Sequence, residues 1–136
     1  MVHIDLSYQG KLHCQAVHGP SGAILETDAP VDNHGLGQSF SPTDLVATAL
    51  AACMATVIGI IGQRKGIVLD GMKISARKIM SSEPPRRIKS IELDLSMPLS
   101  AEHPERALLE NAAVGCPVHQ SLHPDLEVVM HWQWNG

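Results

Sequence analysis

A long apolar run in the first half of the chain constrains the fold more than any other feature. Residues 45–61 are apolar throughout except for two threonines and one glycine. The residues directly before the run predict a helix start, with Ser41 as the N-cap, Pro42 at the first helical position and Asp44 as the acid of a capping box. We therefore expect a helix from this point to about Gln63, where two basic residues and a glycine follow.

This helix is apolar on nearly every side and needs cover on every side. With 136 residues, the chain suits a single domain over residues 1–136. A domain of this size covers a helix completely only by wrapping a sheet around it or by using a second subunit, so we predict a homodimer with this helix near the interface. The run is also as long as the shortest membrane spans, but it lacks an aromatic belt, and we expect no membrane insertion.

The segments on either side of the helix predict strands and shorter helices. Alternating apolar residues with glycine-containing breaks predict three antiparallel strands before residue 29, followed by a loop at Ala29–Phe40. Later patterns predict strands at Leu69–Met80, Ile88–Met97 and Leu126–Trp134, and helices at Pro104–Ala113 and directly after Cys116. In the first of these helices we expect four residues to face inward: Ala107, Leu108, Ala112 and Val114. The order of elements indicates the α+β class.

Charge and motif content argue against several functional classes. The formal net charge is −4, which gives no electrostatic footprint for nucleic acid and argues against an anionic membrane surface as partner. The sequence has no phosphate loop, dinucleotide fingerprint or nucleophile elbow, so nucleotide chemistry is unsupported and we expect no cofactor. The first ten residues show no signal-peptide pattern, and we expect a cytoplasmic protein.

The three cysteines, Cys14, Cys53 and Cys116, are the candidate reactive residues. Their odd number and wide separation do not fit a structural disulfide framework, and no CxxC pair occurs. Cys53 lies in the middle of the apolar helix, where two interpretations are open: a packed core thiol, or a reactive thiol that needs a nearby cation. Cys14 lies in an alternating strand, and we interpret it as a packing residue.

Cys116 has the more thiolate-like setting of the last two cysteines. The sequence Gly115-Cys116-Pro117 places it at the start of a short helix, where backbone N–H groups and the helix dipole favour a negative charge. A loop cysteine without a role is equally compatible with this position. A metal site is a further hypothesis, because Cys116, His119 and His123 are spaced i, i+3 and i+7 on one helix face and suit zinc.

Two segments of the chain resemble the OsmC/Ohr superfamily of osmotically inducible and organic hydroperoxide resistance proteins. They are Ser41-Pro42-Thr43-Asp44-Leu45 through Ala51-Ala52-Cys53-Met54, and Cys116-Pro117-Val118-His119-Gln120-Ser121-Leu122. The resemblance extends over essentially the whole chain. It implies an OsmC-like α+β fold, with antiparallel sheets packed around a long buried central helix, in an intertwined homodimer with two sites at the subunit interface.

The resemblance also implies a thiol-dependent peroxidase that reduces organic hydroperoxides or hydrogen peroxide in oxidative stress defence. By this analogy Cys53 is the peroxidatic thiol, which becomes a sulfenic acid, and Cys116 is the resolving thiol, which forms a disulfide with it. An external dithiol then reduces the disulfide. The alternative is a non-catalytic protein that binds a small apolar molecule or an acyl group in an interface cavity near the two thiols.

The chain departs from the family pattern in the residues that activate the first cysteine. Peroxidatic family members pair that cysteine with an Arg from the N-terminal strands or the following loop and with a Glu at the start of the central helix. Here Lys11 is the only Lys or Arg before Arg64, and Thr43 occupies the Glu position. Arg64 is roughly 16 Å from Cys53 along the helix axis, so a cation from the partner subunit, or His34 of the loop, is the remaining candidate.

Overall fold

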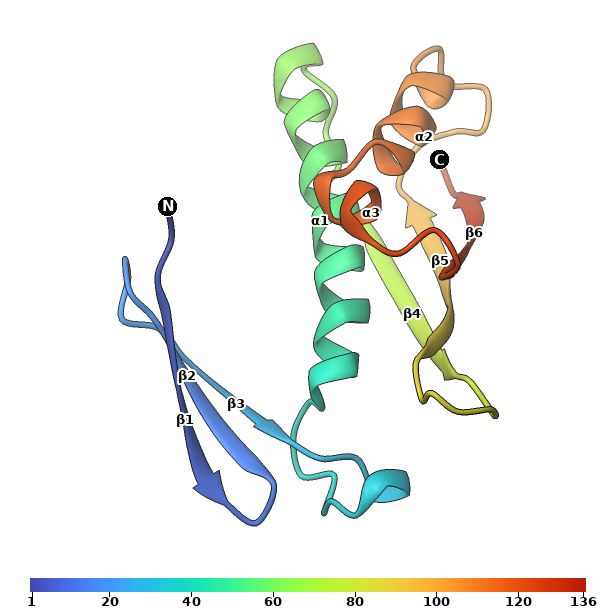
Figure 1. Cartoon of the computed structure of the whole chain (residues 1–136). Coiled ribbons are helices and arrows are strands. Elements are labelled where there is room, and N and C mark those ends of the chain that lie inside the picture. The colour runs from blue at the N-terminus through green and yellow to red at the C-terminus, as the bar shows by residue number, and fades with distance from the viewer. The chain divides into compact units, whose positions relative to one another are not determined.

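The structure is a computed structural model that describes residues 1–136 and divides into two compact units, Met1–Val46 and Ala47–Gly136. The first unit contains the strands β1 (Ile4–Gly10), β2 (His13–His18) and β3 (Ile24–Asp28), and a 3-10 turn, η1 (Val31–Asn33). The strands pair antiparallel in the order β1-β2-β3 (Figure 1). The prediction of three antiparallel strands followed by a loop is confirmed, with η1 as a short element inside that loop.

One face of this first sheet is apolar and exposed. Ile4, Leu6 and Tyr8 alternate along β1, and each is 64% exposed. Leu6 and Tyr8 lie opposite Ala16 and Cys14 of β2. Removing apolar surface from water is favourable. Contact with a second apolar surface would therefore stabilise this sheet.

The long helix, α1 (Pro42–Lys65), begins at the capping box that the sequence predicts. The backbone N–H of Ser41 donates to Oδ2 of Asp44 at 2.9 Å, and the backbone N–H of Asp44 donates to Oγ of Ser41 at 3.0 Å. The helix stops at Gly66, which has a φ of +66° and reverses the chain so that the N–H of Ile67 donates to the carbonyl of Gly62 at 2.9 Å. Both ends of the helix therefore follow from local sequence.

Ser41→Ala is expected to lower the free energy of unfolding by about 1 kcal/mol, the usual cost of removing an N-cap hydroxyl. The hydroxyl is buried and accepts the N–H of Asp44, so alanine leaves that donor without its partner. Urea titration at one fixed protein concentration measures the change. Ser82→Ala, at an exposed position in the turn after β4, serves as the control and is expected to leave the midpoint unchanged.

The second unit contains a sheet of three strands in the order β4-β5-β6: β4 (Lys73–Met80), β5 (Ile88–Met97) and β6 (Glu127–Trp134). β4 and β5 pair antiparallel, whereas β5 and β6 pair parallel. For this pair of strands, the antiparallel sheets that the family resemblance implies are wrong. The parallel pairing is possible because two helices, α2 (Arg106–Val114) and α3 (Pro117–Ser121), bridge the length of the sheet between the two strands.

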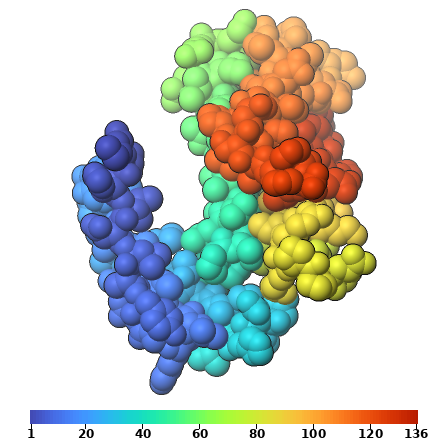
Figure 2. Space-filling model, viewed as in Figure 1, coloured from blue at the N-terminus to red at the C-terminus, as the bar shows by residue number.

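The core of the second unit lies between one face of this sheet and the helices. β5 contributes four fully buried side chains, and α1 and α2 contribute five more. These residues are Ile91, Leu93, Leu95 and Met97 of β5, Leu50, Met54 and Ile58 of α1, and Leu109 and Ala113 of α2. Figure 1 shows α2 and α3 beside α1, and in Figure 2 their orange atoms adjoin the green atoms of α1. The predicted α+β class is confirmed.

α1 is only partly covered by its own chain. In its most apolar 18-residue window, 28% of the residues are buried, and Ile60 is 42% exposed. By length and composition alone the helix is apolar enough to cross a membrane, a test that core helices of soluble proteins also pass. The sequence predicts that another surface covers every side of the helix. In the structure, the side that still needs such a surface is the one that the chain itself leaves exposed.

The inward face predicted for α2 is wrong. The helix buries Leu109 and Ala113, whereas Leu108 and Val114 are 38% and 42% exposed. Apolar residues occur on both sides of this short helix, so its sequence alone does not define which side packs. β4 also begins later than expected, because residues 69–72 form a turn in which one backbone N–H donates back to the first carbonyl at 3.0 Å.

Candidate active site

Two of the three cysteines meet in the second unit. Cys53 lies on α1 and is half-buried, and Cys116 precedes α3 and is fully buried. Both are free thiols, and a side-chain hydrogen bond joins them. Figure 1 shows α3 beside the middle of α1, where Cys53 lies. The fold therefore brings together two thiols that are far apart in the sequence.

The local geometry of Cys116 follows the sequence prediction. Cys116 is the N-cap of α3, and Pro117 occupies the first helical position. The Cys116 Sγ accepts the backbone N–H of His119 at 3.3 Å. This hydrogen bond pins the thiol at the start of the helix and lowers its pKa.

Burial nevertheless opposes the thiolate that the sequence predicts at Cys116. Burial raises the pKa of the Cys116 thiol, and this effect exceeds the lowering caused by the N–H of His119. The hydrogen bond with Cys53 raises the pKa of Cys116 further. A fully buried sulfur loses the hydration that a thiolate needs, and the few backbone donors of a short helix do not replace it.

Access to solvent orders the two thiols. Cys53 is half-buried and within reach of solvent, whereas Cys116 is fully buried. The arrangement suits a sequence of steps in which Cys53 reacts first with an external electrophile and Cys116 attacks it afterwards.

Asp44, the acidic residue at the start of α1, caps the helix. Oδ2 of Asp44 accepts the N–H of Ser41, and the Thr43 hydroxyl lies 3.1 Å from the Ser41 hydroxyl. From residue 45 to residue 63, α1 carries no ionisable side chain except Cys53. The helix that holds Cys53 thus supplies no cation beside it.

The proposed zinc triad is contradicted by the structure. α3 ends at Ser121, so Cys116, His119 and His123 do not share one helix face. His123 is exposed, and its Nδ1 accepts the backbone N–H of Asp125 at 3.0 Å. The structure contains no group of three His, Cys, Asp or Glu side chains that could hold a metal ion. The helix is too short for the i+7 spacing to apply.

An apolar groove of about 340 Å³ runs between α1 and β4. Its lining is Thr48, Ala51, Ala52 and Ala55 from the helix and Met72, Ile74 and Ala76 from β4 and the residue before it. Neither Cys53 nor Cys116 contributes to this lining. The small-molecule alternative predicted a cavity near the two thiols, and this groove lies on a different side of α1.

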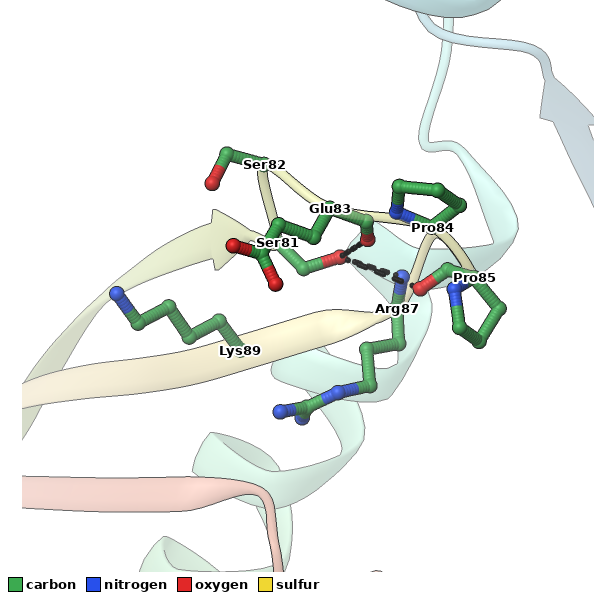
Figure 3. Close-up of a pocket in the computed structure, with 7 residues that line it drawn as sticks. All are labelled: Ser81, Ser82, Glu83, Pro84, Pro85, Arg87 and Lys89. Carbon is green, nitrogen blue, oxygen red and sulfur yellow. Dashed lines mark hydrogen bonds between the residues drawn. The ribbon is translucent and has the colours of Figure 1, made fainter.

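A polar cavity of about 280 Å³ lies at the turn between β4 and β5 (Figure 3). The Ser81 hydroxyl organises the turn, because it accepts the backbone N–H of Arg87 at 3.0 Å and donates to the carbonyl of Glu83 at 3.2 Å. The remaining lining is two prolines, Ser82 and Lys89. These contacts shape a hairpin turn, and no thiol lies in it.

The chain matches one family model and several solved structures. The family model described as OsmC-like protein matches residues 35–131. The chain is similar to the crystal structure of a Psychrobacter arcticus 273-4 protein named for osmotic stress induction and detoxification response. The two share 37% sequence identity over 98% of this chain and 96% of that chain, with a TM-score of 0.91.

Two further solved structures are similar in fold. The organic hydroperoxide resistance protein OhrB of Bacillus subtilis has 17% identity over 98% of both chains and a TM-score of 0.70. A Vibrio cholerae O1 biovar eltor protein named for organic hydroperoxide resistance, with captopril bound in one of its active sites, has 18% identity over 98% of this chain and 92% of that chain, and a TM-score of 0.75. No curated protein matches the chain.

Proposed function

Because the chain belongs to the OsmC-like protein family, we propose that it is a thiol-dependent peroxidase that reduces organic hydroperoxides or hydrogen peroxide. The observation that carries the proposal is the hydrogen-bonded pair of Cys53 and Cys116, one half-buried and one fully buried. Structural neighbours named for organic hydroperoxide resistance support the same general role. We also propose that residues 1–136 form one OsmC-like domain.

The first step of the proposed reaction takes place at Cys53. Its thiolate attacks the terminal oxygen of the hydroperoxide, a sulfur–oxygen bond forms and the O–O bond breaks. The other oxygen leaves with a proton from solvent as an alcohol, or as water from hydrogen peroxide. Cys53 is thereby oxidised to a sulfenic acid while the peroxide is reduced. The half-buried position of Cys53 gives the peroxide access to its sulfur.

The second step uses Cys116 as the resolving thiol. Its sulfur attacks the sulfur of the sulfenic acid, a disulfide forms and water leaves. The hydrogen bond between the two side chains in the reduced protein means that a small movement brings the sulfurs into contact. An external dithiol then reduces the disulfide and restores both thiols, so that no cofactor is required.

We propose further that the protein is a cytoplasmic homodimer that acts in oxidative stress defence. The open face of α1 and the exposed apolar face of β1 are surfaces that a second copy can cover. A partner subunit is also a possible source of the cation that α1 does not carry next to Cys53. The negative net charge fits neither a nucleic-acid nor an anionic-membrane partner.

Intact-mass analysis after one equivalent of cumene hydroperoxide tests the proposal. We expect a mass lower by two hydrogen atoms, with a cross-linked peptide pair that contains Cys53 and Cys116, because a side-chain hydrogen bond already joins the two thiols. Iodoacetamide should then label only Cys14. An unchanged mass with all three thiols still open to iodoacetamide would mean that peroxide does not oxidise this site, and the proposal would be wrong.

The second candidate function is a non-catalytic protein that binds a small apolar molecule or an acyl group. The apolar groove between α1 and β4, with a volume of about 340 Å³, favours it. Native mass spectrometry of protein purified from cells separates the two functions. A bound organic molecule together with peroxide-inert thiols would support the binding protein, whereas disulfide formation without any bound molecule would support the peroxidase.

A further inference from the structure

His119 has a buried polar atom that the reduced protein does not use. The Nδ1 of its imidazole is buried and has no hydrogen-bond partner. Buried polar atoms in native proteins almost always have a partner, because an unpaired one costs its desolvation energy. A buried polar atom without a partner points to a function when its hydrogen-bond partner forms only during a reaction. In the tautomer that carries its hydrogen on Nε2, this Nδ1 presents a lone pair and can accept a proton.

The backbone of His119 lies beside the Cys116 thiol, while its Nδ1 makes no hydrogen bond to either sulfur in the reduced protein. Its backbone N–H donates to the Cys116 Sγ at 3.3 Å, one turn after that residue. α3 has no other ionisable side chain, and the stretch of α1 around Cys53 has none. On α2, Arg106 and Glu110 pair with each other at 3.0 Å. Of the helices around the thiols, only α3 therefore offers a base without a partner, and that base is His119.

The resolving step creates a need for such a base. In the reduced protein a side-chain hydrogen bond joins Cys116 to Cys53. Oxidation bonds the Cys53 sulfur to oxygen and makes it a poor acceptor for the Cys116 proton. Cys116 is fully buried and cannot pass its proton directly to bulk water. A thiol is a poor nucleophile until it loses that proton.

We propose that Nδ1 of His119 accepts the Cys116 proton as Cys116 attacks oxidised Cys53, so that His119 is the general base of the resolving step. This inference rests on the pairing of Cys53 with Cys116 in the proposed function. The S–H bond of Cys116 breaks and its proton moves to Nδ1, while its sulfur electrons form the disulfide. The sulfur–oxygen bond of Cys53 breaks, and the imidazolium returns the proton to the departing hydroxide, which gives water. The Cys116 sulfur is oxidised and the sulfenic sulfur is reduced.

An aromatic disulfide, dithiobis(nitrobenzoate), tests this role without any peroxide. Cys53 attacks it first and releases one coloured thiolate, and Cys116 then attacks the mixed disulfide and releases a second. The departing thiolate needs no proton, so the rate of the second phase reports the loss of the Cys116 proton. In a Cys14→Ser background, we expect His119→Asn and His119→Gln to leave the first phase unchanged and to slow the second about 100-fold.

The pH dependence and a matched control distinguish a base from a structural residue. The slow second phase of both His119 variants should recover as the pH rises, because Cys116 then ionises without help. His123→Asn removes an exposed histidine just beyond α3 and should change neither phase. A folded His119 variant with a second phase at the wild-type rate, or one that stays slow at every pH, would overturn the inference.

The outcomes also separate this inference from the proposed function. If cumene hydroperoxide leaves Cys53 and Cys116 reduced, but the aromatic disulfide gives two phases of which the second depends on His119, the peroxidase proposal fails and the role of His119 stands. If the protein with an intact His119 stops at the mixed disulfide on Cys53, the two thiols do not form a working pair and the inference about His119 fails.

Discussion

Cys53→Ser is expected to abolish peroxide reduction, with a loss of about 1,000-fold or more in rate. A serine hydroxyl is a far weaker nucleophile than a thiolate, and no other cysteine can take over the first step. Cys116 is fully buried and its pKa is raised, so it neither meets a peroxide nor carries the charge to attack one. Consumption of cumene hydroperoxide in the presence of a dithiol measures the loss.

Two further cysteine variants serve as controls for Cys53→Ser. Cys116→Ser should react with one equivalent of peroxide as fast as the wild type and then accumulate a sulfenic acid on Cys53, which dimedone traps. Cys14→Ser, which changes a thiol of β2, should match the wild type in both steps. Peroxide consumption by Cys53→Ser at the wild-type rate would show that the chemistry lies elsewhere in the chain.

Features that depend on a few neighbouring residues could be predicted from the sequence. The capping box of Ser41 and Asp44 forms as predicted, because both partners lie within one helical turn. β5 occupies Ile88–Met97, the same residues that the alternating pattern predicts, because every second residue meets the core. Cys116 caps α3 for the same local reason.

Features that depend on tertiary contacts could not be predicted in this way. The dipole argument favoured a thiolate at Cys116, but the pKa of that thiol is set first by burial, which the sequence does not report. The i+7 spacing of His123 suggested a metal ligand only as long as α3 was assumed to continue past Ser121. The pairing of Cys53 with Cys116 was available from the family resemblance and not from the residues themselves, because it depends on the placement of α3 against α1.

Ala52→Arg is expected to convert the proposed homodimer into monomers. Thr48, Ala52 and Thr56 form a row with i+4 spacing on α1, and all are exposed in the single chain. An apolar helix with such an open row needs a partner surface, and a twofold interface would bury the new charge twice. An unpaired buried charge costs about 3–5 kcal/mol, so the two copies together raise the dissociation constant by a factor of about 10,000 or more. Sedimentation velocity over a range of protein concentrations measures this change.

The same variant tests where the activating cation of Cys53 comes from. Ser82→Arg adds an equal charge to the exposed turn after β4 and should leave the protein dimeric and active. If monomeric Ala52→Arg protein also loses the first reaction of Cys53 with peroxide, a cation from the partner subunit is required, in line with the absence of any basic residue on α1 before Arg64. If the monomer still reacts, the activating cation lies within the chain, and the candidates are a native residue such as His34 and the guanidinium that the substitution adds next to Cys53. A variant that sediments like the wild type would place the interface away from this row and leave the apolar face of β1 as the surface that a second copy covers.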